Sequence, residues 1–134
     1  MLKALKVVLI ADGVVLCVLG AALFALPRTM WMVFGFVGLP DMVNYVLGMW
    51  GALMATMGVG YFIASQDPAR SHGWVWVGIA RGILEGGVSA FYIATHVVTF
   101  KQGGLGLILA VWFALAYIVF YPRRSAMQGA EAGR

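Results

Sequence analysis

Four long apolar runs, separated by short segments rich in proline, glycine and charge, dominate the pattern of this chain. They cover roughly Leu5–Leu26, Met42–Ser65, Gly73–Phe100 and Leu105–Tyr121. Each approaches or exceeds the ~20 residues that an α-helix needs to cross a hydrocarbon layer of about 30 Å. The pattern therefore predicts an all-α fold, a polytopic membrane four-helix bundle.

A shorter apolar segment, Thr29–Leu39, lies between the first two runs. With about 11 residues it is too short to cross a membrane, and we predict a short interfacial helix or a re-entrant piece. The whole chain then divides into a single four-span transmembrane domain, residues 1–124, and a disordered cytoplasmic tail, residues 125–134.

Composition supports a membrane protein. The chain is 63% hydrophobic and 10% charged, whereas about a quarter of the residues in a soluble domain are charged. The net charge of +4 is spread over short clusters at the ends of the runs, which is not the pattern of a nucleic-acid-binding surface. Cys17 is the only cysteine, so the chain has no intrachain disulfide and no CxxC redox pair.

Basic residues predict the orientation. With four spans, most of them fall on the side of the termini, at Lys3, Lys6, Arg70, Arg123, Arg124 and Arg134. Arg28 and Lys101 fall on the opposite side. Since Lys and Arg accumulate in cytoplasmic segments, we predict a multi-pass protein of the bacterial inner membrane with both termini in the cytoplasm.

One face of the third run is polar. On a helix with about 100° per residue, six of its side chains fall within about 80° of one another; they are Arg81, Glu85, Ser89, Tyr92, His96 and Thr99. A ridge of glycines, Gly78, Gly82 and Gly86, runs beside them. Such a ridge permits close helix packing, either inside the chain or between two copies.

Asp12 of the first run matches Arg81 in depth. Each lies about eight residues, or roughly 12 Å, past the start of its run, and the two runs cross in the same direction. Glu85 lies one helical turn deeper, so we expect the three side chains to meet. Because an unpaired charge at that depth costs roughly 3 kcal/mol, Arg81 needs a carboxylate partner.

Three interpretations of this charged set stay open: a structural clamp between helices, a ligand pocket, and a proton or ion path. Ser89, Tyr92 and His96 extend the polar face beyond what a clamp needs, and Asn44 of the second run lies near the depth of His96. The candidates for ligand binding or a proton path are therefore Asp12, Arg81, Glu85, Ser89, Tyr92, His96 and Asn44.

The sequence lacks the motifs of several kinds of catalytic and cofactor-binding sites. The chain has no Ser–His–Asp arrangement, no phosphate loop and no zinc-ligand spacing. His72 and His96 lie about 36 Å apart along a helix, too far to share one haem iron. We therefore predict no catalytic residue, no metal and no cofactor, and an enzyme is the least supported class.

The chain resembles small uncharacterised bacterial four-helix membrane proteins of the DoxX-like and BphX-like kind. The residues that carry the resemblance are Leu26-Pro27 at the end of the first run, the glycine-rich second run, Asp67-Pro68-Ala69-Arg70, and Arg81-Gly82. The resemblance implies an inner-membrane four-helix fold and an accessory role. It transfers no catalytic residue.

Together these observations predict an accessory membrane protein with a polar intramembrane pocket between the first three spans. It would bind a small amphipathic molecule there or dock to a larger membrane complex. The alternative is a small proton-coupled transporter that acts as a homodimer. The expected partners are the lipid bilayer and a homo-oligomer or a larger membrane complex, with no nucleic acid. The sequence names no substrate and no reaction.

Overall fold

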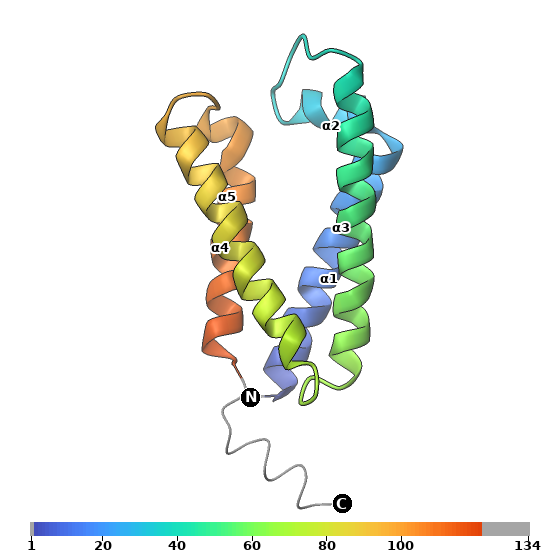
Figure 1. Ribbon diagram of the computed structural model, residues 1–134, viewed down its shortest axis with the longest axis vertical. Coiled ribbons are helices and arrows are strands. Elements are labelled where there is room, and N and C mark those ends of the chain that lie inside the picture. The colour runs from blue at the N-terminus through green and yellow to red at the C-terminus, as the bar shows by residue number, and fades with distance from the viewer. Residues whose placement is uncertain (1, 122–134) are drawn as a thin grey trace, which may run out of the picture.

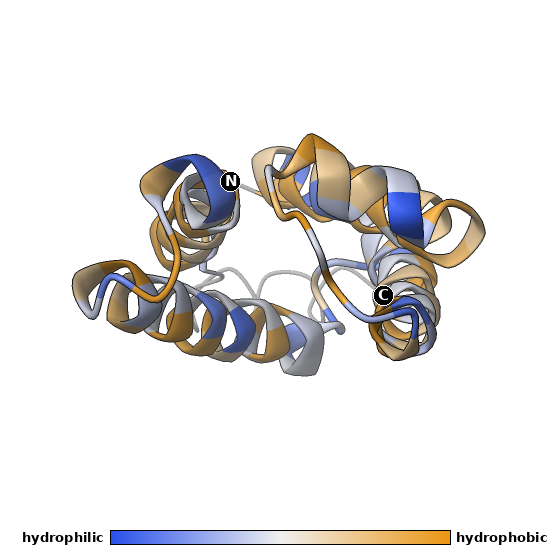
Figure 2. Cartoon of the chain, turned by 90° about the horizontal axis from the view of Figure 1, so that it is seen from above, coloured by the Kyte–Doolittle hydropathy of each residue, from blue (hydrophilic) through white to orange (hydrophobic). Residues whose placement is uncertain are grey.

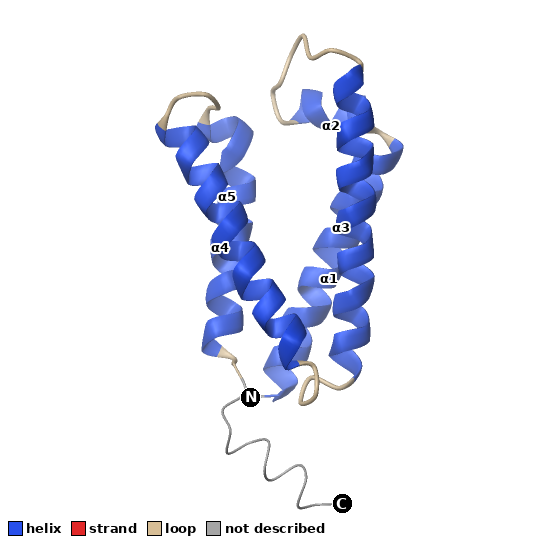
Figure 3. Ribbon diagram, viewed as in Figure 1, coloured by secondary structure: helices blue, strands red, loops and turns tan. Residues whose placement is uncertain are grey.

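The computed structural model describes residues 2–121, and their regular elements are all α-helices (Figure 3). They are α1 (Leu2–Ala25), α2 (Pro27–Val33), α3 (Met42–Gln66), α4 (His72–Ala94) and α5 (Phe100–Val119). Within the described chain, α1, α3, α4 and α5 are long and apolar enough to cross a membrane. The predicted all-α four-span bundle with a short helix after the first span is confirmed. The predicted tail, residues 125–134, lies outside the described residues.

The four long helices form two pairs, α1 with α3 and α4 with α5 (Figure 1). The pairs approach each other at the end where α1 begins, here called the N-terminal end, and diverge toward the end that carries α2, the α2 end. Seen along the bundle, both pairs carry mostly hydrophobic residues (Figure 2). Large apolar side chains such as Val18, Leu53 and Leu84 are more than half exposed. These faces suit lipid rather than water.

Glycines bring the backbones of α1 and α3 almost into contact. A Cβ added at Gly20 would lie 2.6 Å from the carbonyl oxygen of Gly51 and 2.7 Å from the backbone nitrogen of Ala55. A Cβ at Gly58 would lie 2.6 Å from the Sγ of Cys17. Because neither position has room for a side chain, this close packing depends on the small residues, as expected for helices in lipid.

The glycine ridge of the third run faces α5. A Cβ at Gly82 would lie 2.7 Å from the carbonyl oxygen of Ala110, and Gly78 is covered by the ring of Tyr117. Gly86 is packed less tightly, with 3.7 Å between its added Cβ and the Cβ of Ala110. Of the two predicted roles, the structure shows the contact inside the chain.

The predicted third span is too long. α4 ends at Ala94, and residues 95–99 connect it to α5, with His96 in the left-handed region at φ 58°. α5 begins at Phe100, ahead of the predicted start at Leu105. The reason is a capping box: the backbone N–H of Thr99 donates to Oε1 of Gln102 at 2.8 Å. The glycines after Gln102 predict a loop, but this cap holds them in the first turns of α5.

The predicted short helix is α2, which covers only part of Thr29–Leu39. It starts at Pro27, where the missing N–H of proline costs nothing. The indole N–H of Trp31 donates to Oδ1 of Asn44 at 3.1 Å and so ties α2 to the start of α3. Gly35 and Gly38 then take positive φ angles of 80° and 71°, which glycine permits without strain, and the chain turns back toward α3.

A buried core joins the two pairs at the N-terminal end. Its fully buried members come from all four long helices and include Leu5 and Leu9 of α1, Tyr61 of α3, Val75 of α4 and Tyr117 of α5. The pairs diverge toward the α2 end (Figure 1), where Nε2 of Gln102 donates to the carbonyl of Gly35 across the space between them. The candidate site lies where the core ends and the divergence begins.

Candidate functional site

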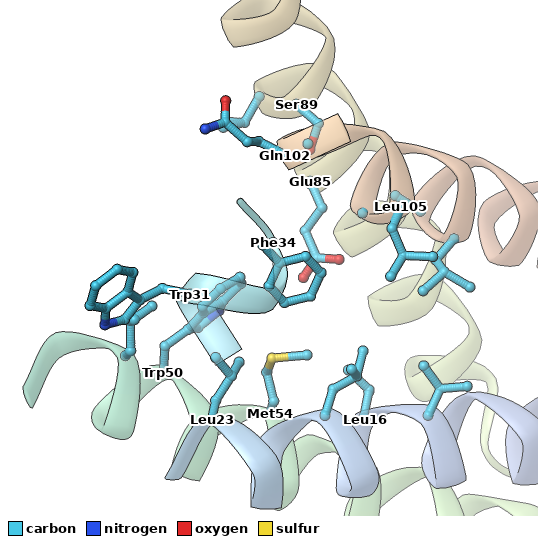
Figure 4. Close-up of a pocket in the computed structure, with 18 of the residues that line it drawn as sticks. Leu16, Leu23, Trp31, Phe34, Trp50, Met54, Glu85, Ser89, Gln102 and Leu105 are labelled. Atoms are coloured by element: carbon cyan, nitrogen blue, oxygen red, sulfur yellow. The ribbon is translucent and has the colours of Figure 1, made fainter. Parts of the chain in front are cut away.

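A cavity of about 480 Å³ lies between the two helix pairs, within the usual range for small-molecule sites. Most of its wall is apolar. Leu16, Leu23 and Met54 face it from α1 and α3, and Trp31 and Phe34 lie beside it from α2 and the following residue (Figure 4). The sequence predicts a pocket between the first three spans. The fourth, α5, contributes to the wall as well, through Leu105, Leu109, Ala110 and Phe113.

The charged side chains of the cavity lie on α1 and α4. Asp12 is fully buried on α1, and Nη2 of Arg81 donates to both of its carboxylate oxygens, at 2.7 and 2.9 Å. The hydroxyl of Tyr117 donates to Oδ2 of Asp12 at 2.8 Å. Asp12 is thus held by hydrogen bonds from α4 and α5, which offset the cost of burying its charge.

Arg81 is also enclosed by aromatic rings. Its side chain is 10% exposed, and its guanidinium carbon lies 5.3 Å from the centre of the Tyr61 ring, a cation–π contact. The ring of Tyr61 stacks on that of Tyr117 at 6.0 Å. Nε and Nη1 of Arg81 and the hydroxyl of Tyr61 have no hydrogen-bond partner within residues 2–121. Arg81 is therefore fixed mainly by Asp12 and by packing.

Glu85 is the more open of the two acids. Its Oε2 lies 3.7 Å from Nε of Arg81, an ion pair without a hydrogen bond, and its side chain is 43% exposed. Figure 4 shows the carboxylate pointing from α4 into the cavity, toward Phe34 and the side chains of the opposite helix pair. An incoming molecule would meet Glu85 before it met Asp12.

The structure brings together four of the seven candidate residues. Asp12, Arg81 and Glu85 meet as their depths predict, and Ser89 lines the cavity one turn above Glu85. Their role in binding or proton transfer stays a prediction.

The other three candidates lie elsewhere. Tyr92 is 44% exposed and contacts Phe91 edge to face. His96 is exposed in the connection after α4, because the helix ends before it. Asn44 bonds Trp31, which lines the cavity, but Asn44 itself does not line it. Within residues 2–121, no hydrogen bond joins Asn44 and His96, whose predicted depths are similar.

Sequence reasoning missed three residues at the site: Tyr61, Tyr117 and Gln102. The two tyrosines are fully buried, although tyrosines near the ends of spans usually belong to the aromatic belt. Gln102 lines the cavity, and its Nε2 donates to the carbonyl of Gly35 at 3.1 Å. The Thr-x-x-Gln spacing is a signal that predicts a helix start at Phe100, and so places Gln102 on α5.

Within residues 2–121, no group of three His, Cys, Asp or Glu side chains is placed to hold a metal ion. Comparison with known proteins identifies no relative: the chain matches no family model, no curated protein and no solved structure.

Proposed function

We propose that this chain is an integral membrane protein that holds a small amphipathic molecule in the cavity between its two helix pairs, in an accessory rather than an enzymatic role. Four helices long and apolar enough to cross a membrane support the membrane part. The observation that carries the binding part is the cavity itself. It combines an apolar wall with a charged set, Asp12, Arg81 and Glu85, at one side.

The volume indicates the size of the bound molecule. At about 30 Å³ for each water-sized group, a cavity of about 480 Å³ holds on the order of sixteen such groups. This matches a molecule with one hydrocarbon chain or ring system and one polar head. The apolar part would lie against Leu16, Leu23 and Met54, and the polar head would face α4.

A buried, mostly apolar layer supports a pocket over a continuous path. Between the charged set and the N-terminal end lie Leu5, Leu9 and Val75, each 0% exposed, together with the rings of Tyr61 and Tyr117. Proton relays in membranes run through chains of Asp, Glu or His side chains, and the described buried residues of this layer include none of these. This arrangement favours a binding site open at one side, so the proton-coupled homodimeric transporter has less support.

The same proposal places the protein in the bacterial inner membrane with both termini in the cytoplasm. The support is the excess of Lys and Arg on the terminal side of the spans. Membership of the DoxX-like and BphX-like group, and assembly into a homo-oligomer or a larger membrane complex, are part of the proposal as well. The four-helix fold is compatible with both.

The test is photolabelling in nanodiscs of zwitterionic phosphatidylcholine, with a 12-carbon alcohol that carries a diazirine in its chain. The protein is then digested, and labelled peptides are quantified by mass spectrometry. Met54→Trp should fill the cavity and reduce labelling of its wall several-fold. Leu53→Trp is the matched control, because Leu53 directly precedes Met54 on α3 and faces outward, 62% exposed. Equal labelling of the two variants and the native protein would contradict the proposal.

A further inference from the structure

Arg81 is the single cation among the described residues that line the cavity, and it faces two acids. Asp12 takes both direct hydrogen bonds that Arg81 makes. Asp12 also accepts the hydroxyl of Tyr117, so its charge is balanced and its oxygens are occupied. The charges of Asp12 and Arg81 therefore balance each other. Nε and Nη1 of Arg81 have no hydrogen-bond partner within residues 2–121, but both atoms are buried, so a molecule in the cavity does not reach them in this arrangement.

Glu85 is left as the surplus charge. Two carboxylates share one guanidinium, so the ionised set carries a net charge of −1. Glu85 lies 3.7 Å from Arg81 without a hydrogen bond and keeps 43% of its side chain exposed. It points into a cavity with apolar walls (Figure 4). A surplus negative charge in such a place is stabilised by a proton or by a cation.

Aromatic rings form part of the cavity wall. Those that line the cavity are Trp31, Phe34, Phe36, Trp50 and Phe113, and the ring of Phe34 lies close to the Glu85 carboxylate in Figure 4. The face of an aromatic ring attracts a cation, and the attraction grows when the cation is desolvated. An ammonium head bound to the Glu85 carboxylate would lie near the ring of Phe34, whereas an anionic head would meet Glu85 as a like charge.

We propose that the cavity selects single-chain amphiphiles whose head is a monocation, with Glu85 as the residue that binds the head. This inference rests on the proposed function, since it names the ligand class of the same cavity. It also assigns different roles to the two acids: Asp12 positions Arg81, and Glu85 meets the ligand.

The experiment uses three diazirine probes with the same 12-carbon chain and different heads: an amine, an alcohol and a carboxylate. Each is added at the same mole fraction to the native protein in phosphatidylcholine nanodiscs, and labelling of the cavity wall is quantified. We expect the amine to label about tenfold more than the alcohol, which corresponds to about 1.4 kcal/mol, and the carboxylate to label least.

Glu85→Gln should abolish the preference for the amine over the alcohol. Labelling of the cavity wall by the alcohol that is still reduced by adding Met54→Trp shows that the variant keeps the cavity and is folded. Asp41→Asn is the control, because it removes the same charge from an exposed position outside the cavity. Because each probe is compared between the native protein and the variants in the same bilayer, differences in membrane partitioning among the probes cancel in the effect of Glu85→Gln.

Other outcomes separate the two proposals. If Met54→Trp lowers labelling by all probes but the native protein shows no preference for the amine, the cation inference fails and the binding pocket stands. Preferential labelling by the carboxylate would also overturn the inference, because it would make Arg81 the ligand contact. If no probe responds to Met54→Trp, both proposals fail.

Discussion

Asp12 is the residue on which the site depends, because it joins three helices. It lies on α1, is fully buried, and accepts hydrogen bonds from Arg81 of α4 and Tyr117 of α5. Removing one member of a buried pair leaves an uncompensated charge, whereas removing both is often close to neutral. The energetic link between Asp12 and Arg81 can therefore be measured separately from their individual contributions.

The double-mutant cycle of Asp12→Asn and Arg81→Met should reveal this link. Each single change should destabilise the protein by about 3 kcal/mol, and the double change by clearly less than the sum. The measurement is unfolding in detergent micelles. The same cycle with Glu85→Gln and Arg81→Met should give a smaller coupling, since Glu85 makes no hydrogen bond to Arg81. Additivity within about 0.5 kcal/mol for Asp12 would show that the pair is not coupled.

Tyr117→Phe should destabilise the protein by about 1.5 kcal/mol or more, because it removes a hydrogen bond to a charged group and keeps the ring. Tyr61→Phe is a matched control on a stacked ring whose hydroxyl has no partner within residues 2–121. Removing an unpaired buried hydroxyl should be neutral or stabilising. Unfolding of the two variants under the same conditions checks this difference. Equal losses would mean that the Tyr117 hydroxyl contributes nothing specific.

At the scale of the helices, small residues decide which surfaces meet. In lipid no hydrophobic effect drives helices together, so close backbone packing carries much of the association. Gly20 and Gly51 do this between α1 and α3, and Gly82 does it between α4 and α5. Within each pair, small residues let the two backbones approach closely. Between the pairs, large side chains surround the cavity.

Gly82→Ala should destabilise the α4–α5 pair by about 1–3 kcal/mol, since its Cβ would lie 2.7 Å from the Ala110 carbonyl oxygen. Gly87→Ala is the control on the same helix. Nothing lies within 4 Å of its added Cβ, and alanine favours a helix over glycine by up to about 1 kcal/mol. Thermal unfolding in micelles measures both. A stable Gly82→Ala variant would indicate that this close approach does not exist.

Gln102 links two elements, and Gln102→Glu separates its two contacts. The glutamate oxygen can still accept the backbone N–H of Thr99 and cap α5. The donation from Nε2 to the Gly35 carbonyl is lost. We expect faster amide hydrogen exchange in residues 34–41 and unchanged exchange in the second turn of α5. Lys101→Leu, a change at the neighbouring exposed position, should alter neither. Unchanged exchange in residues 34–41 of Gln102→Glu would show that this hydrogen bond does not hold the loop.

At the scale of the whole molecule, the two pairs meet at one end and diverge at the other (Figure 1). The buried core at the N-terminal end and the Asp12–Arg81 bond join them, and the cavity occupies the opening beyond. The start of α1, the α3–α4 connection and the end of α5 lie at the same end. This is the arrangement that an even number of spans requires.

Reporter fusions test the orientation. Reporters in residues 67–71 and after Arg124 should be active in the cytoplasm, and one in residues 95–98 should lie outside, because six Lys and Arg fall on the first side and two on the other. A reporter at Gly38 should agree with the one in residues 95–98. If the fusion after Arg124 lies outside, the number of spans is wrong.

The sequence by itself determined the four spans, the short element between the first two, and the meeting of Asp12, Arg81 and Glu85. Span length and hydropathy are local properties, and depth in the membrane follows from counting residues along a straight helix. Local signals failed where two of them competed: at Thr99, glycines predicted a loop, and the capping box with Gln102 began a helix.

Only the tertiary structure decided which helices pair and what lies between them. Tyr61 and Tyr117 are of a residue type that is typical of the membrane interface. They belong to the site because α3 and α5 place them against Arg81 and Asp12. His96 and Asn44 share a predicted depth. However, α4 ends before His96, and the side chain of Asn44 accepts a hydrogen bond from Trp31. A hydrogen-bond partner or a cavity wall depends on which surfaces pack together across the fold, and no spacing along one chain segment contains that information.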